Sequence, residues 1–294
     1  MHNINLSGCG TALVTPFKNG AVDFDAYRAL VRRQVAGGID FLVPLGTTAE
    51  TPTLTADEKV ELFKATREEA PGKILVAGVG SNSLQGTLAN IELLTPYRPD
   101  AWLVVVPFYN KPSQEGIYQY YKAVSEATDI PVLMYNVPGR TGVNMEASTC
   151  IRLAKLPNII GVKEASSRYG QISEIIRGTE NEDFQVLSGN DGETLSLMAT
   201  GAKGVISVAS NVAPELMVAL TDALAAFNIT EARRLHHLLT PLFNACFVES
   251  NPTPTKLALE IMGYCSKEVR LPLVPASEKT KELRTDVIKE IGIC

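Results

Sequence analysis

The chain has 294 residues, of which 45% are hydrophobic and 20% are charged, and its formal net charge at pH 7 is −5. Without a basic stripe or a block of like charge, nucleic acid and anionic membrane surfaces are poor candidates as partners. No stretch approaches the roughly 18 apolar residues that a membrane span requires, and the N-terminus does not resemble a signal peptide. The composition therefore predicts a cytoplasmic globular protein with a large hydrophobic core.

Cysteines and histidines give no sign of a disulfide framework or of a metal centre. Three histidines are present, and the neighbours His236 and His237 do not have the spacing of metal ligands. The odd number and wide scatter of the cysteines favour reduced thiols, as in a cytoplasmic protein. We therefore expect neither a metal nor an organic cofactor. The five cysteines are Cys9, Cys150, Cys246, Cys265 and Cys294.

Short apolar runs alternate with amphipathic segments through the first 227 residues. Eight runs are predicted to be strands: 10–15, 41–46, 73–79, 102–107, 131–135, 159–163, 184–188 and 204–208. Eight segments are predicted to be helices: 24–36, 57–70, 83–94, 113–127, 145–156, 170–177, 191–199 and 213–227. Ser83 and Ser113 are expected to be helix N-caps, and Pro214 is expected in the first turn of its helix.

This alternation predicts an α/β fold with a parallel sheet covered by helices, because the strands are apolar almost throughout. Closing eight βα units produces a (β/α)8 barrel (a TIM barrel) of about the expected size. A doubly wound open sheet is the alternative, but no Gly-x-Gly-x-x-Gly turn follows the first predicted strand. Eight units in succession favour the barrel.

After Phe227 only helical patterns remain, at about residues 230–250, 255–262 and 277–291. Proline-containing segments at 251–254 and 271–275 separate them. We predict that residues 1–227 form the barrel and that residues 228–294 form a C-terminal helical extension packed on it. The extension is not expected to be an independent domain.

Polar side chains follow several of the predicted strands, where catalytic groups of such barrels gather. The apolar run 159–162 leads directly into Lys163, which places an amine at the end of the sixth strand. No glycine cluster suited to phosphate and no acidic pair suited to Mg²⁺ is evident. The other strand-end residues are Thr47 and Thr48 (second strand), Tyr109 (fourth), Tyr135 and Arg140 (fifth), Asn190 and Asp191 (seventh) and Ser207 (eighth).

This set of side chains suits carbonyl chemistry on small carboxylates. In an apolar site a lysine loses ammonium stability, so its pKa falls and the free amine becomes available. The amine can attack a ketone to form an imine, which acts as an electron sink for a carbanion at the next carbon. Tyrosine and threonine hydroxyls can carry protons, and the planar fork of an arginine fits a carboxylate.

Each of these residues also fits an ordinary structural role. A lysine can lie at the surface, a tyrosine ring can fill a core or a loop, threonines can form a turn, and an arginine can remain solvated. Glu164 and Asp191 are interpreted as structural or solvent-facing, without a role in the chemistry. The joint occurrence of the other groups at successive strand ends argues against the structural account.

An ordered set of segments resembles the dihydrodipicolinate synthase family within the N-acetylneuraminate lyase superfamily of Schiff-base aldolases. Any one segment is a weak signal, whereas the set extends over essentially the whole chain. The segments are 10–17, 46–50, 106–112, 135–142, 161–164, 188–191, 204–207 and 251–256.

The resemblance implies a pyruvate-dependent reaction at Lys163, whose amine would form the imine. Thr48, Tyr135 and Tyr109 would form the proton relay, with Tyr109 reaching across from a neighbouring subunit. It also implies a homotetramer built from tight dimers. The reaction would condense pyruvate with L-aspartate 4-semialdehyde in the diaminopimelate route to lysine.

The resemblance further implies how the two substrates are held. Thr47 and Thr48 would bind the pyruvate carboxylate, and Arg140 would bind the carboxylate of L-aspartate 4-semialdehyde. Gly189 and Ile206 would line the site through main-chain oxygens.

Two alternatives remain open. One is a pyruvate aldolase acting on a sugar acid or a hydroxy-oxo acid, and the other is a catalytically silent barrel with a binding or regulatory role. Sialic acid lyases usually carry Ser-Thr in place of Thr47 and Thr48 and lack an arginine at the position of Arg140. These differences favour the synthase, because a condensation of two carboxylates needs a cation. A silent protein would have no reason to keep the lysine and its relay together.

Two departures from the family pattern stand out. Ala49 occupies a place where relatives commonly have glycine, and we expect the loop to tolerate it. At the positions that bind the effector in lysine-inhibited relatives, Asn82 is retained but the other groups differ. Inhibition by L-lysine is therefore expected to be weak or absent. The differing residues are Ala56, Lys59, Gly86 and Phe108.

Overall fold

The computed structural model describes residues 4–293, so Cys294, one of the cysteines expected to be reduced, lies outside the described residues. Eight parallel strands form a closed barrel in the order β1-β10-β9-β8-β7-β6-β5-β4, which confirms the predicted (β/α)8 class. The strands are β1 (Gly8–Ala12), β4 (Phe41–Val43), β5 (Ile74–Gly78), β6 (Ala101–Val105), β7 (Val132–Asn136), β8 (Ile159–Glu164), β9 (Gln185–Ser188) and β10 (Gly204–Ser207).

Helices alternate with these strands and then continue alone in the C-terminal tail, as the sequence predicts. Between the strands and after β10 they are α1 (Phe24–Ala36), α2 (Ala56–Glu69), α3 (Leu84–Leu94), α4 (Gln114–Glu126), α6 (Ala147–Leu153), α7 (Tyr169–Gly178), α8 (Thr194–Thr200) and α9 (Pro214–Ala225). The tail helices are α10 (Ile229–Ala245), α11 (Thr253–Ile261) and α12 (Glu278–Glu290). None of the described helices combines the length and apolar character needed to cross a membrane.

The predicted helix-start signals are confirmed. The Ser83 hydroxyl accepts a hydrogen bond from the Gly86 amide at 3.1 Å, and Ser113 accepts one from Gly116 at 3.2 Å. Pro214 is the first residue of α9, where its missing N–H costs no helix hydrogen bond. Several short elements were not predicted, namely the hairpin β2 (Phe17–Lys18) and β3 (Ala21–Val22), the single turn α5 (Pro138–Thr141), and the 3₁₀ turns η1 (Thr47–Ala49), η2 (Thr51–Thr53), η3 (Thr95–Tyr97) and η5 (Ala209–Asn211). The helix predicted at 191–199 begins as the 3₁₀ turn η4 (Asp191–Glu193), which leads into α8.

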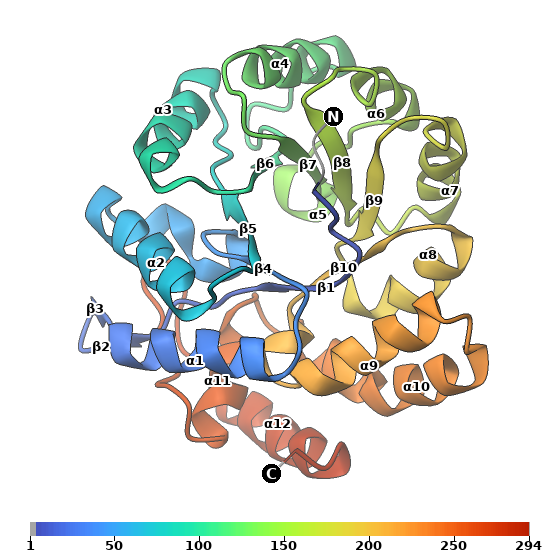
Figure 1. The fold of residues 1–294 in the computed structure, drawn as a ribbon. Coiled ribbons are helices and arrows are strands. Elements are labelled where there is room, and N and C mark those ends of the chain that lie inside the picture. Colours follow the sequence, from blue (N-terminus) through green and yellow to red (C-terminus); the bar gives the residue numbers. More distant parts are fainter. Residues whose placement is uncertain (1–3, 294) are drawn as a thin grey trace. The chain divides into compact units, whose positions relative to one another are not determined.

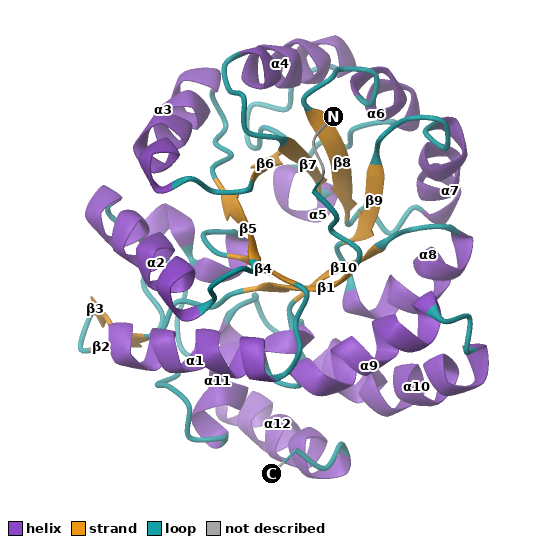
Figure 2. Cartoon of the chain, viewed as in Figure 1, coloured by secondary structure: helices purple, strands orange, loops and turns teal. Residues whose placement is uncertain are grey.

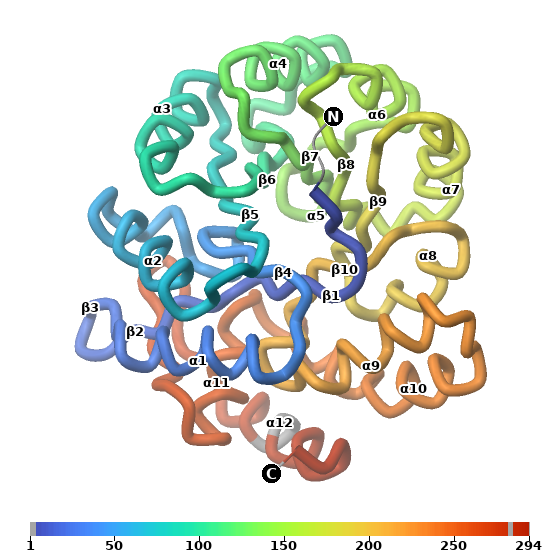
Figure 3. The backbone as a smooth tube through the Cα atoms, viewed as in Figure 1, coloured from blue at the N-terminus to red at the C-terminus, as the bar shows by residue number. Residues whose placement is uncertain are grey.

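The chain divides into two compact units, and the first contains residues 74–206 with the N-terminal segment up to Ser7. In it, α3, α4, α6 and α7 lie outside the strands β5 to β9 (Figure 1). The N-terminal segment runs beside β9 (Figure 3) because Gln185 holds it with two hydrogen bonds. The Leu6 amide donates to the Gln185 side chain, which donates to the Ile4 carbonyl, each at 2.8 Å.

The second unit contains residues 8–73 and the chain from Ser207 onward. Here β1 pairs in parallel with β4, and α1 packs against α2 (Figure 2). The tail helix α10 packs against α9 and α12, so the tail shares this unit with the turn that follows β4. The division into a barrel of residues 1–227 and an extension of residues 228–294 stays a prediction.

Candidate active site

The pairing of β7 with β8 sorts four polar residues onto two faces. Tyr135 lies opposite Lys163 in the register, and Asn136 lies opposite Glu164. Because successive side chains of a strand point to opposite faces, Tyr135 and Lys163 share one face and Asn136 and Glu164 share the other. The Lys163 Nζ lies 4.3 Å from the centroid of the Tyr135 ring. The structure thus brings together two of the predicted site residues.

Lys163 is buried, not a surface residue at a strand end, since it is only 5% exposed. Burial lowers its pKa from 10.5 to about 8, because the ammonium is poorly solvated there. The nearby Asp191 carboxylate opposes this shift, whereas the Arg140 guanidinium adds to it. A useful fraction of the amine is therefore neutral near physiological pH and can act as a nucleophile.

Tyr135 is held as a neutral phenol. Burial raises its pKa to about 12, with the Arg140 charge lowering it and the Glu164 charge raising it. A neutral phenol can donate its proton and can accept another. Its position against the Lys163 amine suits a group that transfers protons near this nitrogen.

The residue that follows β9 leaves room for the lysine because it is a glycine, Gly189. A Cβ at Gly189 would lie 3.1 Å from the Lys163 Cε and 2.7 Å from the Ala165 Cβ. The Gly189 amide also donates a 2.8 Å hydrogen bond to the Glu164 carbonyl. Gly189 therefore borders the lysine side chain, and Ile206 lies fully buried on β10. Their predicted role through main-chain oxygens stays a prediction.

Arg140 lies exposed on the short helix α5, in the loop that follows β7. The side chain of Asn136, at the start of this loop, bonds to its far end. Its Nδ2 donates to the Asn144 Oδ1 at 3.0 Å, and its Oδ1 accepts from the Met145 amide at 3.0 Å. The loop is thus closed at its base while the guanidinium at its tip stays accessible.

Glu164 is fully buried, which excludes the solvent-facing half of its sequence interpretation. Its carboxylate accepts hydrogen bonds from Asn136 Nδ2 at 3.1 Å and Gln171 Nε2 at 3.3 Å. It also accepts one from the Ser166 amide at 2.8 Å. Burial raises its pKa, and these donors lower it. Glu164 therefore joins the base of the Arg140 loop to the strand that carries Lys163.

Asp191 is also buried, at 3% exposure, in the 3₁₀ turn η4 after β9. This too excludes a solvent-facing position. Its negative charge raises the pKa of Lys163 and so limits the loss of the ammonium form. Asn190 donates from its Nδ2 to the Ser167 hydroxyl at 3.0 Å.

Tyr109 does not join the buried pair of its own chain. Its side chain is 87% exposed, and its backbone has a φ of 73°, which is unusual for a bulky residue. Such a conformation persists only where the surrounding structure requires it, and it is common at functional sites. Within residues 4–293, no group of three or more His, Cys, Asp or Glu side chains is arranged to hold a metal ion.

In the second unit, Thr47 and Thr48 lie on η1, directly after β4. Thr47 is exposed, whereas Thr48 is buried and its hydroxyl accepts a 2.9 Å hydrogen bond from Asn251 Nδ2. Ala49 belongs to the 3₁₀ turn and does not have a positive φ. The left-handed residue is Glu50, with a φ of 55°, so alanine at position 49 introduces no backbone strain.

Asn251, Glu50, Lys256 and Arg270 contact this turn or each other, and their roles were missed from sequence. Glu50 and Lys256 form a salt bridge of 2.9 Å with both side chains almost fully buried. Three of these residues lie in the family-like segments 46–50 and 251–256. The sequence therefore marked these segments as important, but it did not show which residues contact each other.

Replacing Lys163 with methionine is predicted to stabilise the protein at pH 7. The gain should approach about 3 kcal/mol, the equivalent of lowering a lysine pKa from 10.5 to about 8. Above pH 8 the folded protein loses this proton before the unfolded chain does, so the free energy of unfolding of the wild type rises with pH. The difference in free energy of unfolding between the variant and the wild type therefore narrows towards pH 10.5. Urea unfolding of both proteins across this range measures it.

The exposed Lys155, replaced by methionine, is the matched control and should show no such pH-dependent gap. A Lys163→Met protein that is less stable at pH 7, or a gap that does not change with pH, would contradict the burial of a titrating amine.

The chain matches one protein family almost from end to end. The sequence profile of the Dihydrodipicolinate synthetase family matches residues 5–291. A 4-hydroxy-tetrahydrodipicolinate synthase from Thermotoga neapolitana is 49% identical over 290 residues, which cover 97% of this chain and 99% of the relative.

Solved structures agree with this match. The crystal structure of the dihydrodipicolinate synthase from Thermotoga maritima has a TM-score of 0.96 at 47% identity, covering 98% of this chain and 99% of that chain. The chloride-inhibited enzyme from Acinetobacter baumannii, solved in complex with pyruvate, has a TM-score of 0.96 at 38% identity and covers 99% of this chain and 100% of that chain. Since the family match, the relatives and the fold agree, the chain belongs to the dihydrodipicolinate synthetase family.

Proposed function

We propose that the chain is a 4-hydroxy-tetrahydrodipicolinate synthase, which condenses pyruvate with L-aspartate 4-semialdehyde through an imine on Lys163. The observation that carries the proposal is a buried lysine whose amine has a pKa of about 8 and lies 4.3 Å from the Tyr135 ring centroid. Family membership and the pyruvate complex of the Acinetobacter baumannii relative support the choice of pyruvate. The enzyme is thus a class I, Schiff-base lyase of the aldolase type.

The Lys163 amine begins the reaction by attacking C2 of pyruvate. Loss of water from the adduct forms the imine, whose nitrogen draws electrons from the neighbouring methyl group. A proton then leaves the methyl carbon, and the resulting enamine attacks the aldehyde carbon of the second substrate. These steps need one neutral amine and a nearby proton carrier, and they need neither a metal nor an organic cofactor.

Tyr135, Thr48 and Tyr109 are assigned to the proton relay. The neutral phenol of Tyr135 beside Lys163 supports its part, because it can both accept and return a proton. Thr48 and Tyr109 are assigned on the resemblance of their segments to the family. The exposed phenol of Tyr109 fits a role in the site of another subunit and not in its own.

The two substrate carboxylates are assigned to different groups. Thr47 and Thr48 bind the carboxylate of pyruvate, and Arg140 binds that of L-aspartate 4-semialdehyde. The accessible guanidinium on α5 supports this, since bidentate pairing with a carboxylate is the strongest contact an arginine makes. Gly189 and Ile206 border the site through their main-chain oxygens.

The assembly that this account requires is a homotetramer built from tight dimers. Tyr109 completes the relay only if a neighbouring chain lies beside it. The 87% exposure of the Tyr109 side chain supports this, because an exposed aromatic side chain is free to contact a neighbouring chain. We also assign the enzyme to the cytoplasm, because the odd number and wide scatter of the cysteines in the sequence fit a reducing compartment.

Pyruvate and cyanoborohydride are predicted to form one stable adduct, at Lys163. The rate of its formation should rise with pH up to about 8 and then level off, because only the neutral amine attacks the ketone. Peptide mass spectrometry locates the adduct. Lys163→Ala should form no adduct and lose turnover by several orders of magnitude, whereas Lys155→Ala should retain both. A Lys163→Ala enzyme with near-normal turnover would remove the imine mechanism.

Arg140→Ala is predicted to weaken the binding of the second substrate, L-aspartate 4-semialdehyde, more than the binding of pyruvate. Loss of a charge-assisted contact of about 1.5–3 kcal/mol should raise the KM for L-aspartate 4-semialdehyde roughly 10- to 100-fold. The KM for pyruvate and the yield of trapped adduct should change little. Steady-state kinetics with each substrate varied in turn measures this, with the exposed Arg177→Ala as control. An equal or larger rise in the KM for pyruvate would contradict the assignment of Arg140 to the second substrate.

Mixed subunits test whether Tyr109 acts in a neighbour's site. Tyr109→Phe and Lys163→Ala enzymes should each be nearly inactive, and hybrids formed by co-expression should regain about a quarter of the wild-type activity with random pairing in dimers. In a hybrid, the subunit with an intact lysine receives an intact Tyr109 from its partner. Hybrids of Tyr135→Phe with Lys163→Ala are the control and should regain nothing, because both changes affect the chain's own site. No recovery in the first pair would contradict the exchange.

A further inference from the structure

The Thr48 hydroxyl is oriented by a residue of the C-terminal tail. Asn251 Nδ2 donates to the Thr48 oxygen at 2.9 Å, and the two residues are 5% and 3% exposed. Because the oxygen accepts in this contact, the hydroxyl proton points elsewhere and remains available for transfer. Among the described residues, Asn251 is the one hydrogen-bond partner of the Thr48 side chain. Asn251 alone therefore fixes the direction of the Thr48 hydroxyl group.

The turn that carries Thr48 is held at a second point, two residues later. Glu50 has a left-handed backbone, with a φ of 55°, which is costly for a residue other than glycine. Its carboxylate accepts from Lys256 Nζ at 2.9 Å and from the Arg270 amide at 3.0 Å. The Glu50 and Lys256 side chains are 1% and 0% exposed. Each buried charge needs the other, so this pair holds the backbone of the turn in its unusual conformation.

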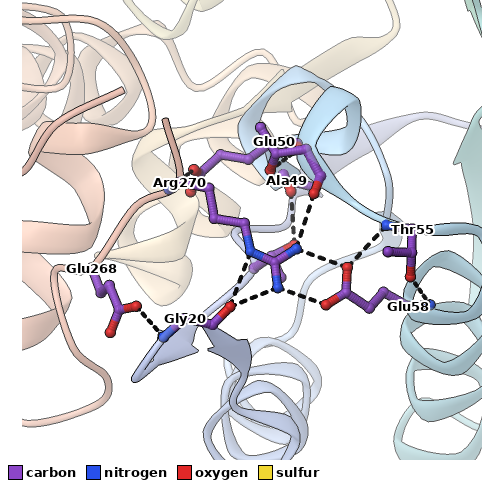
Figure 4. Close-up of polar contacts among 9 residues, drawn as sticks. Gly20, Ala49, Glu50, Thr55, Glu58, Glu268 and Arg270 are labelled. Carbon is purple, nitrogen blue, oxygen red and sulfur yellow. Dashed lines mark hydrogen bonds and ion pairs between the residues drawn. The ribbon is translucent and has the colours of Figure 1, made fainter. Parts of the chain in front are cut away.

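Arg270 holds the turn at a third point and joins it to the hairpin (Figure 4). Its guanidinium donates to the Thr53 carbonyl at 2.9 Å and to the Gly20 carbonyl at 2.9 Å. The same group pairs with both oxygens of Glu58, at 2.7 and 2.6 Å. Glu58 in turn accepts from the Thr55 amide, which closes the N-terminal end of α2 as a capping box.

One aromatic ring contacts both cations. Lys256 Nζ is 4.2 Å and Arg270 Cζ is 4.4 Å from the centroid of Phe17. Contacts of this kind stabilise a cation whose hydration has been removed. Three tail residues thus contact three positions of one turn, Asn251 at Thr48, Lys256 at Glu50, and Arg270 at Glu50 and Thr53.

We propose that Asn251 is a positioning residue for the reaction, which directs the Thr48 hydroxyl proton into the relay, and that Lys256 and Arg270 keep the Thr48 turn in place through Glu50. The C-terminal tail then acts on the chemistry without touching the substrate. This inference rests on the proposed role of Thr48 as a proton carrier. It predicts a defect in proton transfer and not in imine formation.

The direction of the hydrogen bond separates positioning from simple packing. Asn251→Asp keeps the shape but replaces the donor with an acceptor, so the Thr48 proton is bound by the new carboxylate. Asn251→Ala removes the partner and frees the hydroxyl to rotate. Positioning predicts a larger defect for the aspartate variant, whereas packing predicts a larger defect for the smaller alanine. Asn244→Asp, on the exposed face of α10, controls for the added charge.

Two readouts at pH 8 distinguish the affected step. Exchange of the pyruvate methyl protons in D2O, followed by NMR without the second substrate, reports proton transfer. Cyanoborohydride trapping reports imine formation. We expect exchange to fall at least 30-fold in Asn251→Asp and about fivefold in Asn251→Ala, with trapping within twofold of wild type in both. Asn244→Asp should match wild type. Equal exchange in Asn251→Asp and wild type, or the reverse order of the two variants, overturns the inference.

A double-mutant cycle tests whether Asn251 acts through Thr48. In a Thr48→Val background the Asn251→Ala change should lower exchange by less than twofold further, because the group it orients is already absent. A full additional fivefold loss would mean that Asn251 acts by another route. The cycle also decides the matter if Asn251→Asp does not fold.

Arg270→Lys tests the indirect part, since a lysine keeps the charge but cannot reproduce the fork that reaches Thr53, Gly20 and Glu58. We expect a threefold to tenfold loss of exchange with trapping unchanged, and no loss would overturn this part. Failure of the proposed function itself would look different. The wild-type protein would then show neither exchange nor a trapped adduct.

Discussion

The reactivity of this site depends on the burial of one amine, that of Lys163. Lys163 is the second-last residue of a strand whose residues are all buried, and removal from water lowers its pKa to about 8. This burial makes the amine a nucleophile and makes the lysine costly to the folded protein, so the same interaction produces reactivity and reduces stability. The Asp191 carboxylate limits the shift and Arg140 extends it, which leaves the pKa near the pH at which a cell works. A fully solvated lysine would be protonated and inert.

The two faces of the β7 and β8 pair carry residues with different proposed roles. One face carries Lys163 and Tyr135, which do the proposed chemistry, and the other carries Glu164 and Asn136, which hold the structure around it. Asn136 closes the base of the loop that bears Arg140, so the cation proposed to bind the second substrate is tied to the strand pair that bears the proposed nucleophile. In the other unit, the Thr48 turn receives its order from the tail. In the proposed mechanism, buried polar networks position the reacting groups.

Sequence patterns predicted the eight βα units, several caps and the strand ends because apolar runs and turn residues are local signals. They also placed Lys163 and Tyr135 at neighbouring strand ends. They could not predict that Asn251 meets Thr48 across 203 residues or that Lys256 pairs with Glu50 across 206, since no local pattern specifies such partners. For the same reason, the sequence allows either a structural or a solvent-facing position for Glu164, and only its packing decides between them. Periodicity did not predict α5 or the hairpin of β2 and β3, because these elements are too short to show a repeating hydrophobic pattern.

The most direct test of the central claim is pyruvate consumption by the purified protein with a small set of aldehyde acceptors. The set contains L-aspartate 4-semialdehyde, N-acetylmannosamine and glyceraldehyde, each supplied separately with pyruvate. The account predicts consumption with the semialdehyde alone, because Arg140 provides a cation for its carboxylate. Turnover only with a sugar aldehyde would keep Lys163 as the nucleophile but contradict the assigned substrate and the role of Arg140. No turnover with any acceptor, and no adduct, would contradict the account as a whole.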